Sequence, residues 1–102
     1  PGITFGALKA AVEGIGTKRG MKTVMQLHGC GYGDDGPLFS ARLPNDRARD
    51  LTIQAGNTFV WKPLAMSADQ RIKFAWGGPV IVSDPGCELL FKREHGMVEI
   101  VE

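Results

Sequence analysis

The chain has 102 residues, of which 43% are hydrophobic and 23% are charged, so its composition is that of one small globular domain rather than a disordered segment. Its 12 Lys and Arg residues nearly balance its 11 Asp and Glu residues, and the formal charge of +1 argues against a dedicated nucleic-acid-binding protein, which carries a basic excess. No apolar run reaches the ~20 residues of a membrane span and no signal-peptide pattern is seen, so we expect a cytoplasmic protein that does not bind membranes. Cys30 and Cys87 form no C-x-x-C pair and are expected to be reduced thiols.

The first predicted element is an amphipathic helix beginning after Thr4, whose hydroxyl is suited to cap the first turn. Its apolar residues recur at spacings of three, four and three, which place them on one helix face: Phe5, Leu8, Val12 and Ile15. We expect the helix to end within residues 14–16, because Gly is unfavourable inside a helix and common just beyond its end.

The middle of the chain is expected to be irregular. Residues 22–27 alternate loosely between polar and apolar, and they lead into a glycine-dense segment, 28–36, that predicts a turn. No periodicity holds over residues 37–50, where Pro44-Asn45-Asp46 indicates a turn within a loop.

Strands are predicted for the rest of the chain. Residues 58–62 are aromatic and β-branched and stop at Pro63, which has no amide donor, whereas residues 71–76 alternate cleanly. The segments 79–83 and 87–91 flank Asp84-Pro85-Gly86 and predict a β-hairpin. We therefore expect a single α+β domain over residues 1–102, with one N-terminal helix, a mainly antiparallel sheet, and a core containing Phe59, Trp61, Phe74 and Trp76.

Three segments, in this order, resemble motifs of the creatinase, aminopeptidase P and methionine aminopeptidase superfamily, whose catalytic domain has the pita-bread fold. His28–Tyr32 is similar to the family's H-G-x-G-L, with Pro37 as the proline that follows. Leu51–Pro63 is similar to L-x-x-G-M-x-x-x-x-E-P, and Gly77–Leu90 is similar to E-D-T-V-x-V-T-x-x-G-x-E-x-L. The resemblance implies the C-terminal half of a pita-bread domain, and hence a fragment that exposes sheet edges and apolar surface and forms homo-oligomers.

In this family two divalent metals are held by two Asp, one His and two Glu. By the resemblance, His28 takes the position of the ligand histidine, whereas Lys62 and Gly77 stand where the two glutamates are found. A protonated ammonium has no lone pair to donate to a metal, and glycine has no side chain. We expect no metal or other cofactor; a divalent ion such as Mn²⁺, Co²⁺ or Zn²⁺ is expected only if Lys62 and Gly77 do not occupy the glutamate positions.

The candidate catalytic residues are therefore His28 and Lys62. An ammonium at Lys62 supplies positive charge where the metals are missing and is able to hold a substrate carboxylate. The alternatives are that Lys62 points into solvent at a strand end and that the His28 imidazole only closes its turn by bonding the backbone.

Asp34 and Asp35 are candidate substrate-binding residues for a cationic group; otherwise they serve as turn residues. The glycines of residues 28–33 do not predict a phosphate-binding loop, because no helix follows them directly. Cys30 lacks an oriented base, which argues against a nucleophile, and His95 is expected to be solvent-exposed.

Two functions remain open for the parent protein. The first is a peptidase-like or creatinase-like hydrolase that has lost its metal ligands and acts without metal, or is inactive as a peptidase, on a small-molecule or peptide substrate. The second is a non-catalytic binding or dimerisation domain that keeps the fold. We expect the chain alone to be inactive under either interpretation.

Overall fold

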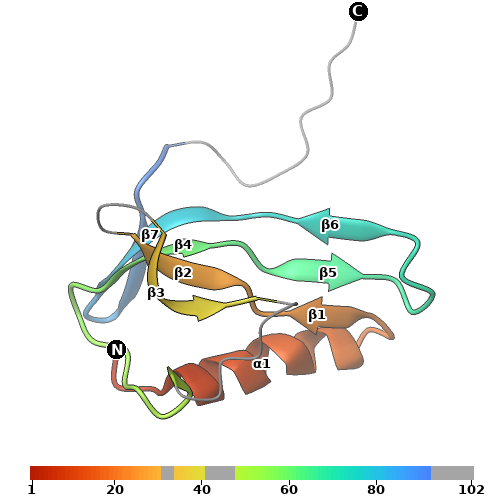
Figure 1. Cartoon of the computed structure of the whole chain (residues 1–102), viewed down its shortest axis with the longest axis horizontal. Helices are drawn as coiled ribbons and strands as arrows, with labels where there is room; N and C mark the ends of the chain where they lie inside the picture. Colours follow the sequence, from red (N-terminus) through yellow and green to blue (C-terminus); the bar gives the residue numbers. More distant parts are fainter. Residues whose placement is uncertain (31–33, 41–47, 93–102) are drawn as a thin grey trace, which may run out of the picture.

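A computed structural model describes residues 1–30, 34–40 and 48–92, with the backbone alone for residues 30, 34 and 35. This part of the chain is an α+β fold with one helix and two antiparallel sheets, in the strand orders β1-β5-β6 and β3-β2-β4-β7-β8 (Figure 1). The elements are α1 (Phe5–Thr17), β1 (Lys22–Val24), β2 (Leu27–Cys30), β3 (Asp34–Phe39), β4 (Thr58–Trp61), β5 (Leu64–Met66), β6 (Lys73–Ala75), β7 (Gly78–Ser83) and β8 (Gly86–Leu89). In these residues no helix has the length and apolar character needed to cross a membrane.

Three long extended segments pass through both sheets, and each segment is interrupted at the same level, where one sheet ends and the other begins. β1 continues into β2, β4 into β5, and β6 into β7, so the three-stranded sheet extends sideways from the larger one (Figure 1). At the junction the Lys62 amide donates to the Gln26 carbonyl over 2.8 Å, and the Trp76 amide donates to the Pro63 carbonyl over 3.4 Å. The expected strand end at Pro63 is confirmed, but the chain resumes a strand immediately afterwards.

Helix α1 begins as predicted and ends later than predicted. The Thr4 hydroxyl accepts a hydrogen bond from the Ala7 amide at 3.2 Å, which confirms the cap. The helix continues through Gly14 and Gly16 to Thr17, so the expected end within residues 14–16 is wrong. The reason is packing: a Cβ on Gly16 would lie 2.6 Å from the Thr23 amide nitrogen, so glycine at this position permits close contact with β1 instead of ending the helix.

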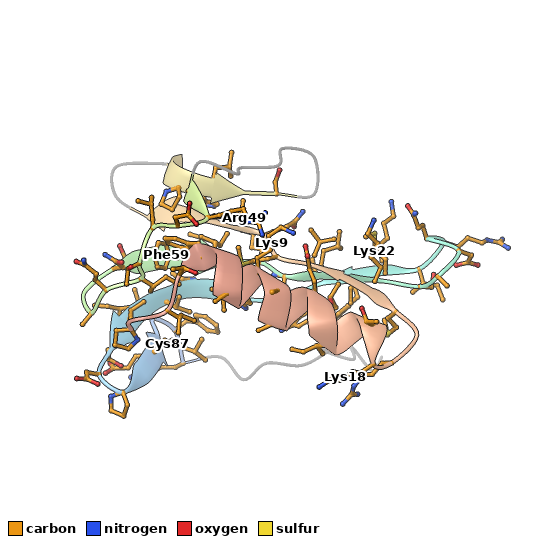
Figure 2. The ribbon with its side chains drawn as sticks, turned by 90° about the horizontal axis from the view of Figure 1, so that it is seen from below. Lys9, Lys18, Lys22, Arg49, Phe59 and Cys87 are labelled. Atoms are coloured by element: carbon orange, nitrogen blue, oxygen red, sulfur yellow. The ribbon has the colours of Figure 1, made fainter. Side chains whose placement is uncertain are left out.

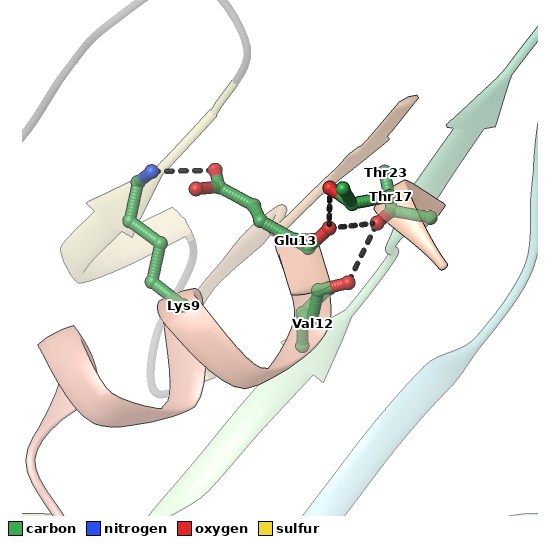
Figure 3. Close-up of polar contacts among 5 residues, drawn as sticks. All are labelled: Lys9, Val12, Glu13, Thr17 and Thr23. Atoms are coloured by element: carbon green, nitrogen blue, oxygen red, sulfur yellow. Dashed lines mark hydrogen bonds and ion pairs between the residues drawn. The ribbon is translucent and has the colours of Figure 1, made fainter. Parts of the chain in front are cut away.

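Thr23 attaches the three-stranded sheet to α1 (Figure 3). Its buried hydroxyl donates to the Val12 carbonyl at 2.6 Å and accepts from the Gly16 amide at 3.1 Å. On the same stretch of the helix, Lys9 and Glu13 form an ion pair one turn apart. A buried hydroxyl that satisfies two backbone groups stabilises this end of the helix where few apolar side chains are available.

The apolar core lies between α1 and one face of the five-stranded sheet (Figure 2). The Phe5 ring is at its centre, with ring centroids 5.3 Å from Phe39 and 5.4 Å from Phe59. The buried hydrophobic residues of this core are Phe5, Val12, Met25, Leu27, Phe39, Ala48, Ile53, Phe59, Val80 and Val82. The predicted core position of Phe59 is confirmed, and Trp61 packs against the core while remaining partly exposed.

The glycine-dense segment was expected to form a turn and instead contributes to two paired strands. Residues 27–30 form β2 and residues 34–39 form β3, so the turn expected over 28–36 and the loop expected from 37 are wrong at these positions. Residues 22–27, which alternate loosely in the sequence, contain β1 and the first residue of β2. Pairing with distant strands decides these conformations, because local sequence gives weak strand preferences. The expected turn at 44–46 lies outside the described residues.

The C-terminal hairpin is confirmed: β7 pairs with β8 around the turn at Asp84 and Pro85. Residues 73–75 form β6 within the predicted strand, but the expected burial of its aromatic side chains is wrong. Phe74 is 46% exposed and Trp76 is 40% exposed, because α1 packs against β1, at the opposite edge of the three-stranded sheet from β6 (Figure 1).

Candidate functional site

The face of the five-stranded sheet opposite α1 carries His28 and Lys62. In β4, Phe59 and Trp61 pack on the helix side and alternate with Val60, and Lys62 follows directly after the strand, two residues beyond Val60. His28 lies directly opposite Val60, so His28 and Lys62 share the other face. The structure therefore brings these two predicted residues to one place.

Both residues line a cavity of about 190 Å³. The remaining lining residues lie in β2, β3 and β4 or directly beside these strands: Gln26, Leu27, Leu38, Phe39, Ser40 and Val60. Gln26, Leu38 and Ser40 were not predicted as site residues, because the segment containing β3 has no strand periodicity in the sequence.

An irregularity between β2 and β3 accounts for the cavity. Leu27 pairs with Phe39 and Gly29 with Asp35, so β3 uses four residue steps where β2 uses two, and His28 lies between the two pairs. Bulges of this kind bend a strand away from its partner and change the direction of side chains. Here the bulge lies next to His28, where Leu38, Phe39 and Ser40 form one wall of the cavity.

The His28 ring is oriented by a contact with the backbone of the next residue, Gly29. Its Nδ1 lies 2.8 Å from the Gly29 carbonyl oxygen, and because a carbonyl only accepts hydrogen bonds, Nδ1 carries the proton. The lone pair of the neutral imidazole is then on Nε2. This is the tautomer required of a base or metal ligand that acts through Nε2, although the same contact also fits the purely structural role considered for His28.

Lys62 provides the positive charge of the cavity. Its backbone is held by the bond to Gln26, and its side chain is exposed while contributing to the lining. None of the described lining residues is a carboxylate, so no acid in the lining neutralises the ammonium. An ammonium with no carboxylate among the described lining residues favours a small anion.

Gly77 lies at the junction between β6 and β7, against the backbone of Trp61. Its φ is +130°, and a Cβ at this position would lie 1.9 Å from the Trp61 carbonyl oxygen. No other residue fits this backbone without a rearrangement of the junction. The glutamate that the resemblance places at this position is therefore incompatible with the local structure as well as absent from the sequence.

The described residues contain no group of three or more His, Cys, Asp or Glu side chains able to hold a metal ion. Asp34 and Asp35 lie in β3 opposite Cys30 and Gly29, so their alternative role as turn residues is wrong. Their side chains, the Cys30 thiol and all of His95 fall outside what the structure describes. Cys87 is an exposed free thiol.

Three larger hollows lack this combination of groups. One of about 510 Å³ at the end of α1 has Glu13 and Lys22 but no histidine among its described lining residues. Another, of about 740 Å³, is open and has Asp50 as its only ionisable side chain among the described lining residues. The third, of about 520 Å³, is apolar and includes Trp61, Trp76, Val80 and Leu89. The smallest cavity is the candidate site because, of these four hollows, it alone has both a histidine and a lysine among its described lining residues.

Within the described part of the chain one carboxyl group has a perturbed pKa, and it lies in a turn of the three-stranded sheet. The Ser67 hydroxyl and the Arg71 amide donate to Asp69 in the turn between β5 and β6, and these bonds lower the pKa of the Asp69 carboxyl below its ordinary value. The stabilisation from an Asp with a lowered pKa is present above its unfolded-state pKa and is lost as the pH falls through the folded-state pKa. The bonds also order the turn that precedes β6.

Searches for similar proteins found no matching family model, no matching curated protein and no matching solved structure.

Proposed function

We propose that the chain binds a small carboxylate in the cavity between His28 and Lys62, as part of a pita-bread-like domain in which a lysine replaces the metal centre. The observation that supports this is the shared cavity itself: His28 and Lys62 line about 190 Å³ of space with no carboxylate among the described lining residues. The resemblance to the creatinase and aminopeptidase superfamily supplies the chemical context, since that family acts on small C–N bonded substrates.

The two polar residues have different roles in this proposal. The Lys62 ammonium neutralises the carboxylate through a charge-assisted hydrogen bond. His28, with Nε2 as its basic atom, accepts a proton from a ligand group or a water molecule beside that carboxylate. Hydrolysis of a C–N bond in the parent protein is the reaction this arrangement serves, with His28 as base and Lys62 as the substrate anchor.

The cavity restricts the ligand to a small molecule. At roughly 30 Å³ for each water in the liquid, about 190 Å³ holds the equivalent of about six water molecules. Leu38 and Val60 supply apolar walls that suit a short aliphatic carbon chain next to the carboxylate. A metal-dependent peptidase is disfavoured by the lysine and by the close approach of Gly77 to the Trp61 carbonyl.

Titration with acetate and with propionate, followed by NMR of backbone amides and of the His28 ring protons, tests the proposal. We expect saturable shifts confined to residues around the cavity, and their loss in Lys62→Met. The matched control is Lys18→Met, an exposed lysine at the end of α1, which retains binding.

Shifts that follow ionic strength alone, or binding that persists in Lys62→Met, would overturn the proposal. Elemental analysis of the purified protein is an independent check, because stoichiometric bound transition metal contradicts a site organised by an ammonium.

The second candidate, a non-catalytic interaction domain, is favoured by the exposed aromatic side chains of β6. Carboxylate titrations separate the two functions, since an interaction domain requires no ligand at Lys62.

A further inference from the structure

Strand β6 is an edge strand with an exposed apolar stripe. In the described part of the chain β6 pairs with β5 alone, leaving its other edge open. Ile72, Phe74 and Trp76 are 72%, 46% and 40% exposed, and the last two rings stack with centroids 5.6 Å apart. Edge strands of this composition are templates for pairing with another strand.

The hydrogen bonds to β5 show which backbone groups face outward. The Ile72 carbonyl accepts from the Ser67 amide, and the Trp76 amide donates to the Pro63 carbonyl. Since the direction of backbone groups alternates along an antiparallel strand, Ile72, Phe74 and Trp76 bond inward, and Lys73 and Ala75 present their amides and carbonyls to the open edge.

These outward groups define how a second copy of β6 would pair with the first. An antiparallel pair centred on Phe74 sets Lys73 opposite Ala75 of the other copy, with both residues offering outward N–H and C=O groups. The same register sets Ile72 opposite Trp76 and Phe74 opposite itself, so the apolar stripe becomes continuous across the two chains.

Charge distinguishes this register from its neighbour. Centred on Lys73, the pair would put two ammonium groups directly opposite one another, which is destabilising. Centred on Phe74, the two Lys73 side chains occupy diagonal positions roughly 7–8 Å apart, exposed to water and screened by salt.

We propose that β6 is a homodimer interface, in which two copies of the chain pair antiparallel about Phe74 and join their three-stranded sheets into one six-stranded sheet. The turn before β6, ordered by the bonds to Asp69, presents the strand for pairing. The inference rests on β6 alone and stands or falls separately from the cavity of His28 and Lys62.

The test introduces a charge at Phe74, which in the proposed dimer lies opposite Phe74 of the second copy. Sedimentation equilibrium over a concentration series is expected to show a dimer for the wild-type chain and a monomer for both Phe74→Glu and Phe74→Lys. An equimolar mixture of these two variants is expected to restore a dimer containing one of each, because opposite charges then meet at the centre of the pair. The control is Leu51→Glu, which places a charge at an exposed leucine outside β6 and leaves the dimer intact.

Circular dichroism checks that each variant remains folded. A wild-type chain that stays monomeric at millimolar concentration, or an oligomer that survives Phe74→Glu, would overturn the proposal. Failure of the two charged variants to associate when mixed, while each is folded and monomeric, would overturn the register centred on Phe74.

Discussion

Two aromatic groups in this molecule have similar sequence patterns and opposite environments. Phe59 lies in β4, is 8% exposed, and meets the edge of the Phe5 ring at an angle of 84°. Phe74 lies in β6 and stacks on Trp76 at 21°, yet it remains 46% exposed. In both segments two aromatic residues lie two positions apart, so the spacing of the aromatic residues alone does not separate them.

The difference is where α1 lies. The helix begins at Phe5 over the five-stranded sheet and ends at Thr17 beside β1, where Thr23 bonds to it. β6 is beyond its reach. The pattern of a strand therefore indicates only that it has an apolar face. Another element, from the same chain or from a second one, has to pack on that face to bury it.

Truncating the two rings gives the largest expected contrast. Phe59→Ala should lower the free energy of unfolding by about 3–5 kcal/mol, because it opens a cavity in the core beside Phe5. Phe74→Ala should cost less than about 1 kcal/mol in dilute solution, since its side chain already contacts water. Urea denaturation of both variants measures this difference, and equal losses would contradict the division into a buried and an exposed region.

Substitution at Gly77, where β6 leads into β7 at the junction of the two sheets, should lower the free energy of unfolding nearly as much. Gly77→Ala is expected to cost about 3 kcal/mol, because the new Cβ overlaps the Trp61 carbonyl and the positive φ disfavours a side chain. Gly56→Ala is the matched control: its φ is also positive, at +85°, but no atom lies within 4 Å of the new Cβ, so about 1 kcal/mol is expected. Similar thermal midpoints for the two variants would show that the bend at Gly77 adapts to a side chain.

The attachment of the three-stranded sheet to α1 gives the smallest of these effects. Thr23→Val should cost about 2 kcal/mol, because the Val12 carbonyl and the Gly16 amide lose their buried partner. Thr17→Val, at an exposed helix position, should change the free energy of unfolding by less than about 0.5 kcal/mol. Hydrogen exchange in β1 and β5 should accelerate only in Thr23→Val, and uniform acceleration across the chain would contradict a local attachment.

The elements of the fold whose conformation depends on residues close in the sequence could be predicted. Helix α1 follows from its apolar spacing and from Thr4, and the β7–β8 hairpin follows from its turn residues. The strands β2 and β3 could not, because their glycine-rich segments become strands through pairing with each other and, for β2, with β4. β5 was also missed, since three residues after a proline show no usable periodicity.

For the candidate site, sequence resemblance identified His28 and Lys62, and the structure places both on one cavity. It did not identify Gln26, Leu38 or Ser40, which reach the cavity through the bulge between β2 and β3. A bulge depends on how two strands align, and that alignment is a property of the pair. The resemblance also placed Gly77 at a glutamate position without showing that the backbone excludes a side chain there.

By itself the amino-acid sequence determined the α+β class, the capped helix and the hairpin. Tertiary structure decided which alternating strands are covered, how three long runs bend at one level, and which side chains share the cavity. The physical reason is that capping, turns and periodicity involve residues a few positions apart, whereas burial and cavity shape arise only when distant segments meet.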